Sequence, residues 1–235
     1  MRNTGKLFAA GLRQIARDGM LLVLVPAPLF AGLFFRFAIP LIDRALTERF
    51  SFSIAAWYGL ADGMLICLAP MFVAIISAFL ILEERDEGLG AFYQITPSAG
   101  YPYLLARIGI PMGWALGVTL LVALACKLSP LSFQTVLQSA IVSSLTGVFL
   151  AMMVVSLAGN RVEGLAVSKL TGISFAGLIL LWFVPAPHHY WLAFLPSFWI
   201  GKLVMEGADP LPFALGILTC LLWIALFTRR FLRRV

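Results

Sequence analysis

The chain has 235 residues, of which 61% are hydrophobic and only 12% are charged, and its net charge is +6. A soluble domain is nearer half apolar and a quarter charged, so most of this apolar surface must face lipid. The basic balance is typical of orientation in a membrane rather than of nucleic-acid binding. The sequence holds no GxxxxGK followed by Ser or Thr, which excludes ATP hydrolysis by a P-loop in this chain. We predict one all-α integral membrane domain over residues 1–235.

Six apolar stretches are candidates for helices that cross the bilayer, which takes about 20 residues. The stretch 170–201 is too long for one straight span and is broken by Pro185, Pro187 and Pro196, so we divide it into a span and an outer segment. The predicted spans are 20–42, 57–82, 104–126, 134–158, 170–184 and 210–227.

Lysine and arginine residues predict the orientation, because the cytoplasmic loops of membrane proteins carry an excess of them. With the N-terminus inside, twelve of the 17 basic residues fall in cytoplasmic segments and five on the outer side. The reverse orientation would place the twelve on the wrong side. We therefore expect a multi-pass protein of the cell (inner or cytoplasmic) membrane with both termini cytoplasmic.

Residues 1–18 predict an amphipathic interfacial helix. At about 100° per residue, the basic residues gather on one face and the apolar residues on the opposite face. Such a helix lies in the headgroup plane, held by apolar burial and by attraction to anionic lipid. We interpret it as a membrane anchor; the alternative is an elbow that also grips a cytoplasmic partner. The anchoring residues are Lys6, Arg13 and Arg17 on one face and Phe8, Leu12 and Ile15 on the other.

The segment 83–97 combines charge with apolar and aromatic residues. Four of the chain's 11 acidic residues lie within 83–87, and negative charge is favoured at the start of a short helix. An apolar helical face and a Thr-Pro stop suit docking into a groove on another protein, with a solvated cytoplasmic loop as the alternative. The face and the stop consist of Leu89, Phe92, Tyr93, Thr96 and Pro97.

The segment 187–206 is apolar but too interrupted for a full span. We predict a re-entrant or interfacial piece on the outer face, where its Trp and Tyr residues fit an aromatic belt. His188 and His189 are adjacent, which keeps their imidazoles off one helical face, so we expect no metal site. The cysteines are interpreted as packing residues: Cys67, Cys126 and Cys220.

Small residues recur at every fourth position of the third and fourth spans. Such rows let membrane helices approach closely. We interpret them as packing within the chain, which predicts that these two spans lie side by side; a dimer seam is the alternative. The rows are Gly109, Gly113 and Gly117 in one span and Ser139, Ser143, Gly147 and Ala151 in the other.

Asp62 is the one acidic residue inside an apolar stretch. An ionisable residue within the membrane is a functional candidate, here for proton or substrate contact along a pathway. Asp62 follows Trp57 by five residues, so a position at the outer interface is the alternative. Arg36 could likewise lie within the membrane or at its outer interface, and the side chains of Arg36 and Asp62 could pair across the first two spans.

The residues around the second and third spans resemble the ABC-2 transporter permease family. In that family the second span ends in a Glu-rich, Gly-terminated stretch, followed by a short helix, a Pro-containing turn and a basic residue that enters span three. Here 80–88 reads LILEERDEG, 95–97 reads ITP and 103–107 reads YLLAR, while 193–199, AFLPSFW, is similar to the family's segment between spans five and six. The short chain is most similar to small permeases that export fluoroquinolones or other drugs.

The resemblance implies an N-terminal amphipathic helix, six spans, a coupling helix after span two and re-entrant outer helices. It also implies a dimer, with a second copy or a homologous permease, driven by separate ABC ATPase subunits that hold the ATP and Mg. This chain then needs no cofactor of its own. The implied ATPase contacts are Glu83, Glu84, Arg85, Glu87, Leu89, Phe92, Tyr93 and Thr96.

The leading hypothesis is a membrane-spanning permease subunit of an ATP-binding-cassette exporter for an amphipathic or hydrophobic drug, peptide or lipid. The chain carries no HExxH or GxSxG motif, so we expect no catalysis by the permease itself. An intramembrane enzyme acting on lipid is one alternative. An ion-coupled carrier is another; it needs several buried charges, and Asp62 alone qualifies. A scaffold without transport is also open.

Overall fold

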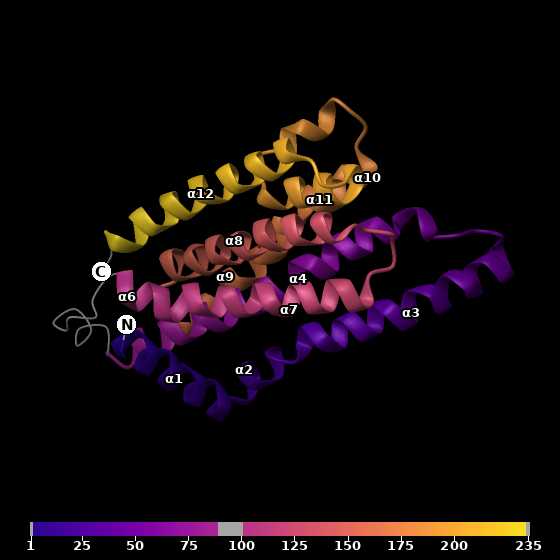
Figure 1. Cartoon of the computed structure of the whole chain (residues 1–235). Coiled ribbons are helices and arrows are strands. Elements are labelled where there is room, and N and C mark those ends of the chain that lie inside the picture. Colours follow the sequence, from indigo (N-terminus) through magenta and orange to yellow (C-terminus); the bar gives the residue numbers. More distant parts are fainter. Residues whose placement is uncertain (1, 89–100, 234–235) are drawn as a thin grey trace.

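The computed structural model describes residues 2–88 and 101–233, and this part of the chain is helical with short connections and no strand. Figure 1 shows a bundle of long helices with both chain termini at the same end. The helices are α1 (Arg2–Arg17), α2 (Gly19–Leu24), α3 (Ala27–Phe50), η1 (Ala55–Trp57), α4 (Tyr58–Asp86), α6 (Tyr101–Leu104), η2 (Leu105–Gly109), α7 (Ile110–Cys126), α8 (Phe133–Leu157), α9 (Arg161–Ser168), η3 (Lys169–Phe175), α10 (Ala176–Phe183), η4 (His188–Leu192), α11 (Pro196–Glu206) and α12 (Pro210–Leu232).

Within the described residues, six helical stretches are long and apolar enough to cross a membrane, which confirms the predicted number. The first span runs on to Phe50 rather than ending at 42, and the fifth begins at Arg161 rather than at 170. The six stretches are Gly19–Phe50, Ala55–Asp86, Leu105–Cys126, Phe133–Leu157, Arg161–Phe183 and Pro210–Phe231.

The early start of the fifth span comes from a capping box. The Asn160 side chain accepts a hydrogen bond from the backbone N of Glu163 at 2.8 Å, and the Glu163 carboxylate accepts one from the backbone N of Gly159 at 2.6 Å. The two side chains satisfy backbone donors that would otherwise be unpaired. An Asn followed three residues later by Glu is a helix-start signal, but hydropathy alone does not reveal it.

The first span is longer than predicted because α3 continues as one helix through the polar residues that follow residue 42. Its 32-residue stretch would be roughly 48 Å long, against a hydrocarbon core of about 30 Å. The outer part forms a projecting hairpin with the start of α4 (Figure 1). Asp43 closes this hairpin by accepting hydrogen bonds from the Tyr58 hydroxyl at 2.8 Å and from the backbone N of Ile54 at 2.7 Å.

The second and fourth spans form the centre of the bundle. α8 packs against α4, α12, α7 and α11, and α4 also packs against α7. In the most apolar windows of the second and fourth spans, 72% and 78% of the residues are buried, against 11% in the first span and 17% in the sixth. The first and sixth spans therefore present their apolar side chains to lipid or to another membrane protein.

The row of small residues in α8 packs against α4, not against the glycine row of α7. The Ser143 hydroxyl donates to the carbonyl oxygen of Ile66 at 3.0 Å. A Cβ atom at Gly147 would lie 2.9 Å from the carbonyl oxygen of Pro70 in α4 and 2.7 Å from the Met112 sulfur of α7. Pro70 is inside α4 and leaves a backbone surface on which only a glycine fits.

The third and fourth spans are neighbours as predicted, but through other residues. The Ser144 hydroxyl in α8 donates to the carbonyl oxygen of Met112 in α7 at 2.8 Å. A Cβ atom at Gly113 or Gly117 would meet nothing within 4 Å. The α7 glycines therefore take no part in this contact, because Gly113 and Gly117 lie on the exposed side of that helix.

Gly147 and Gly113 give a matched pair of substitutions. We expect Gly147→Ala to lower the free energy of unfolding by about 1–3 kcal/mol, because its methyl group would overpack the α4–α8 contact. Gly113→Ala should be neutral or slightly stabilising, since the methyl group meets open space and alanine favours helix. Unfolding in detergent micelles measures both, and equal effects would contradict the assignment of Gly147 to the helix contact.

Between the fifth and sixth spans the chain turns back into the bundle. α11 packs against α10, α12, α8 and α4, and Phe198, Ile200 and Leu203 are fully buried. The Lys202 ammonium group bonds to the Glu206 carboxylate at 2.5 Å. Protein covers this interrupted stretch on several sides, as irregular backbone at membrane depth requires. Its re-entrant placement in the bilayer stays a prediction.

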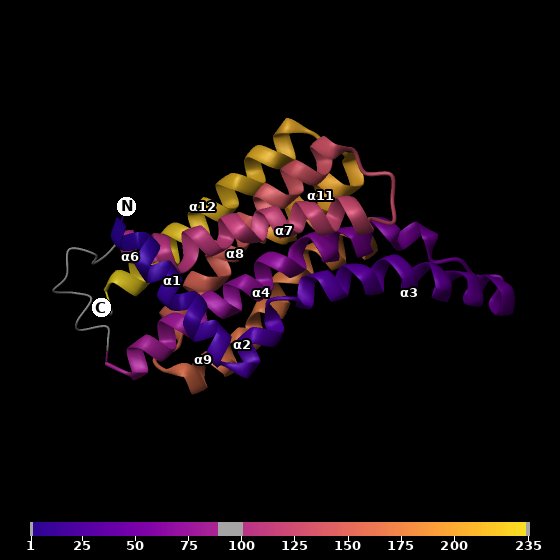
Figure 2. The same ribbon diagram turned by 60° about the horizontal axis from the view of Figure 1, so that its bottom comes forward.

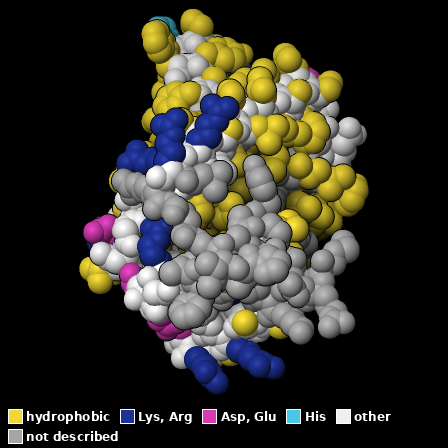
Figure 3. All heavy atoms as spheres, turned by 90° about the vertical axis from the view of Figure 1, so that its left-hand side faces the viewer, with side chains coloured by type: hydrophobic (Ala, Val, Ile, Leu, Met, Phe, Trp, Pro, Cys, Tyr) yellow, Lys and Arg dark blue, Asp and Glu magenta, His cyan; other side chains and the backbone are white. Residues whose placement is uncertain are grey.

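α1 lies across the ends of α4 and η2 at the end of the bundle that holds both termini (Figure 2). Figure 3 looks onto this end, where dark blue Lys and Arg side chains stand among a few acidic ones. These basic side chains belong to the set from which the orientation is predicted.

Candidate functional site

Residues 83–86, here called the α4 end cluster, form the last turn of α4. The helix stops at Gly88, whose φ of +73° is the left-handed conformation common just after a helix C-terminus. The prediction that these acidic residues open a short coupling helix is therefore wrong. Negative charge at a helix C-terminus is opposed by the helix dipole, so the cluster needs partners from other helices.

Glu84 and Arg107 form a buried ion pair, each only 3% exposed. The Arg107 guanidinium donates to one Glu84 carboxylate oxygen, and the Tyr103 hydroxyl donates to the other at 2.5 Å. Arg107 lies in η2, a π-helical turn where the third span begins. The pair therefore joins the end of the second span to the start of the third span.

Arg161 connects the cluster to the start of the chain and to the fifth span. Its guanidinium donates to the Asp18 carboxylate and lies 3.4 Å from a Glu83 carboxylate oxygen, while its backbone N donates to Asp86 at 2.9 Å. The hydrogen bond from Arg161 holds the pKa of Asp18 below its usual range. Asp18 also caps the first turn of α2, so one carboxylate serves two elements.

Arg85 reaches the ends of the fourth and sixth spans. It donates to the carbonyl oxygen of Ala158 at 2.9 Å, and its guanidinium carbon lies 5.8 Å from the ring centre of Phe231. Ala158 directly follows α8, and Phe231 lies in the last turn of α12. A cation over an aromatic ring is favourable, and the carbonyl bond satisfies an unpaired helix end.

The last turn of α4 therefore contacts the same end of the third, fourth, fifth and sixth spans, and Arg161 links it to Asp18 at the start of the first span. Glu84 and Arg85 have separate partners, whereas Glu83 and Asp86 both bind Arg161. These contacts are ion pairs and hydrogen bonds that hold helix ends together. Sequence patterns place these charges near the membrane surface, but their partners lie far away along the chain, 75 residues in the case of Asp86 and Arg161.

The predicted ATPase contacts divide into four groups. Glu84 is buried in its ion pair, Glu83 and Arg85 are half-buried, and Glu87 is exposed. The four that follow lie outside the described residues: Leu89, Phe92, Tyr93 and Thr96. A partner that approaches this end meets Glu87 rather than Glu84.

The predicted apolar face of α1 is turned only partly toward the protein, since Leu12 on it is 52% exposed. Three of its side chains line a cavity formed with α4 and α7, whereas two basic side chains are exposed. The side chain of Lys6 lies outside the described part of the chain. The cavity residues are Phe8, Leu12 and Ile15, and the exposed residues are Arg13 and Arg17.

Asp62 holds a loop in place at the other end of α4. It is 1% exposed and accepts hydrogen bonds from the backbone N of Leu128 and of Ser129, each at 2.8 Å, and from the Ser129 hydroxyl. Asp62 thus binds the connection between α7 and α8. This use of the carboxylate is structural, and no cavity among those described includes Asp62 in its lining.

Arg36 and His189 also have partners other than those considered from the sequence. The Arg36 guanidinium donates to the carbonyl oxygen of Ala125, not to Asp62. His189 Nδ1 lies 3.2 Å from the carbonyl oxygen of Val184. Among the described residues, no group of three or more His, Cys, Asp or Glu side chains is placed to hold a metal ion.

Comparison with known proteins identifies relatives across nearly the whole chain. Residues 11–231 match the family model described as fluoroquinolones export permease protein Rv2686c-like. Two curated relatives are the fluoroquinolones export permease proteins MT2760 and Rv2686c, from the CDC 1551 / Oshkosh and the ATCC 25618 / H37Rv strains of Mycobacterium tuberculosis. Each is 25% identical over 205 residues, which cover 84% of this chain and 80% of the relative. No solved structure matches. The chain belongs to the Rv2686c-like fluoroquinolones export permease family, which is a family of ABC-2-type permeases, the class that the sequence motifs resemble.

Proposed function

We propose that this protein is the membrane-spanning subunit of an ATP-driven exporter that moves an amphipathic or hydrophobic drug outward. The observation that carries the proposal is the α4 end cluster, which joins the end of the second span to the third, fourth, fifth and sixth spans and, through Arg161, to the start of the first. The names of the relatives support drug export, with fluoroquinolones as the first class to test. The alternatives of a lipid-modifying enzyme and an ion-coupled carrier have no such support.

The driving step in this proposal comes from a partner. An ABC ATPase subunit, which holds ATP and Mg, binds residues 87–97 on the cytoplasmic side. Glu87, Leu89, Phe92, Tyr93 and Thr96 make the contact. Closure of the ATPase displaces this segment, and the cluster transmits the displacement because the Glu84–Arg107 ion pair within it is shielded from water.

The assembly in this proposal has two permease subunits, either two copies of this chain or one copy and a homologous permease. The exposed apolar side chains of α3 and α12 are available for that contact and for lipid. The protein lies in the cell membrane with both termini cytoplasmic, because that orientation places the excess of Lys and Arg inside.

Co-purification with ABC ATPase subunits co-expressed from the same organism tests the proposal. Phe92→Asp should release the ATPase, since an aspartate in an apolar contact loses its hydration without gaining a partner. Val162→Asp is the matched control: Val162 is 81% exposed in α9, at the same end of the molecule but outside the segment. Equal retention of the ATPase by both variants, with both folded, would refute the coupling contact. Loss of fluoroquinolone resistance without loss of ATPase would point to the pathway instead.

A further inference from the structure

An apolar cavity of about 270 Å³ lies between α1, the α2–α3 junction, α4 and α7. Its walls are aliphatic and aromatic apart from two polar side chains, Ser77 and Arg107. Cavities with such linings do not hold ordered water and instead take up apolar molecules. The cavity is therefore suited to a hydrocarbon group.

The two polar side chains have unused hydrogen-bonding atoms. Arg107 is 3% exposed, and its Nε has no hydrogen-bond partner within the described part of the chain. Ser77 is fully buried, and its hydroxyl likewise has no partner there. Buried donors are normally satisfied, so both indicate an acceptor that comes from outside the chain.

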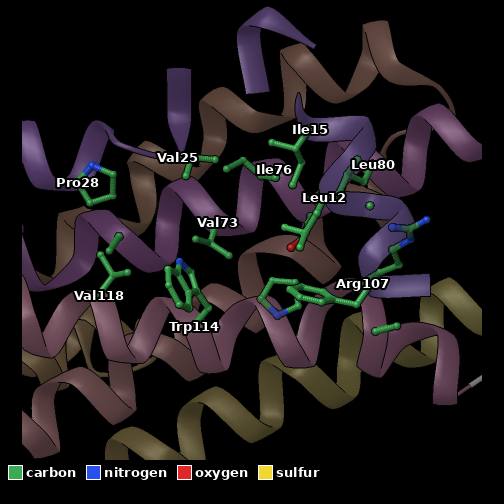
Figure 4. A pocket seen from close by; sticks show the side chains of 16 residues that line it. Leu12, Ile15, Val25, Pro28, Val73, Ile76, Leu80, Arg107, Trp114 and Val118 are labelled. Atoms are coloured by element: carbon green, nitrogen blue, oxygen red, sulfur yellow. The ribbon is translucent and has the colours of Figure 1, made fainter. Parts of the chain in front are cut away.

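The cavity is elongated, with a polar and an apolar end. Figure 4 shows Arg107 near Leu12 and Leu80 at one end, and Pro28 and Val118 at the other. Arg107 and Val118 are 11 residues apart along η2 and α7, or roughly 16 Å at the helical rise. This length is close to half of the roughly 30 Å hydrocarbon core, which is the depth of one leaflet.

The cavity also adjoins the lipid-facing surface. Val25, between α2 and α3, is 47% exposed, and Trp114 in α7 is 67% exposed, although both line the cavity. Gly11 brings α1 against Arg107, so the interfacial helix covers the polar end. A molecule can therefore enter sideways from the membrane between the first and third spans.

We propose that this cavity binds one acyl chain of a membrane phospholipid from the leaflet in which α1 lies, with the lipid phosphate at Arg107. A phosphate accepts charge-assisted hydrogen bonds from guanidinium groups, and basic sites between spans near the membrane surface suit phospholipid headgroups. The bound lipid would fill the space between α1 and the bundle and fix α1 against the α4 end cluster. This assignment does not depend on the ATPase or on the transported drug.

Photolabelling of the full chain in detergent micelles tests the proposal. The probe is phosphatidic acid with a diazirine at the end of one acyl chain, and the labelled peptides are mapped by mass spectrometry. We expect labelling around Pro28, Ala69 and Val118. Val118→Trp should reduce it about tenfold, because an indole takes the volume of the chain. Leu121→Trp is the matched control, since Leu121 is 60% exposed on the same helix and is absent from the cavity lining.

Two further experiments separate the contribution of the lipid phosphate from that of the acyl chain. A diacylglycerol probe with the same chains lacks the phosphate and should label about tenfold less, because it forgoes the charged hydrogen bonds. Equal labelling by both probes, or equal labelling of the two tryptophan variants, would overturn the assignment. Displacement of the phosphatidic acid probe by a fluoroquinolone would also overturn it, by making the cavity a drug site.

Discussion

Arg107→Met should lower the free energy of unfolding by about 3–5 kcal/mol, because it leaves the buried Glu84 carboxylate without its cation. Methionine fills similar volume, so the loss reports the charge rather than a cavity. Since folded proteins are stable by only about 5–15 kcal/mol, much of the variant should fail to accumulate in the folded state. The measurement is thermal or denaturant unfolding in detergent micelles.

The double variant Glu84→Leu with Arg107→Met serves as the control for that result. Removing both charges should restore most of the stability, since no unpaired charge then remains buried. If the α4 end cluster transmits the movement of the ATPase to the spans, the double variant should fold but export drug poorly. A single Arg107→Met variant with wild-type stability would show that the pair is hydrated. A double variant with full export would show that the pair transmits nothing.

Asp62→Ala should lower the free energy of unfolding by about 2–4 kcal/mol, the second-largest effect we expect. The substitution leaves the backbone N–H groups of Leu128 and Ser129 without their acceptor, and each unsatisfied buried group costs about 1–3 kcal/mol. The connection between α7 and α8 should then become susceptible to proteolysis. Limited proteolysis followed by mass spectrometry would locate the cleavage, and unfolding in micelles would give the energy.

Asp62→Asn distinguishes the structural role from a role in proton coupling. The amide oxygen keeps one acceptor but cannot take up and release a proton, so we expect partial stability and nearly normal export. A well-folded Asp62→Asn variant without export would contradict the structural assignment. It would favour the ion-coupled carrier, in which an intramembrane carboxylate is required.

Sequence patterns were reliable where a physical property repeats along the chain. Each span is visible in the sequence as about 20 apolar residues, because a helix that faces lipid must satisfy its backbone hydrogen bonds internally. The number of spans was therefore predicted correctly. Span ends were less predictable. Gly88 after α4 and the capping box at Asn160 are local signals for a helix end and a helix start. The predicted span ends followed hydropathy instead of these signals.

The rows of small residues show what such patterns do not predict. Spacing by four positions places Gly113 and Gly117 on one face of α7 and Ser143 and Gly147 on one face of α8. It does not say which helix each face meets. The α8 row packs against the backbone of α4 near Pro70, while the α7 glycines face outward.

The sequence by itself determined the membrane class, the number of spans, the predicted orientation and the likeness to ABC-2 permeases, because these depend on composition and on order along the chain. Only the tertiary structure decided the partners of the charges. Glu84 with Arg107 and Asp18 with Arg161 are pairs between distant elements, and Asp62 binds the loop between α7 and α8. In a medium that offers no water, each buried charge takes the nearest compatible group, and that group is set by how helices pack, not by sequence spacing.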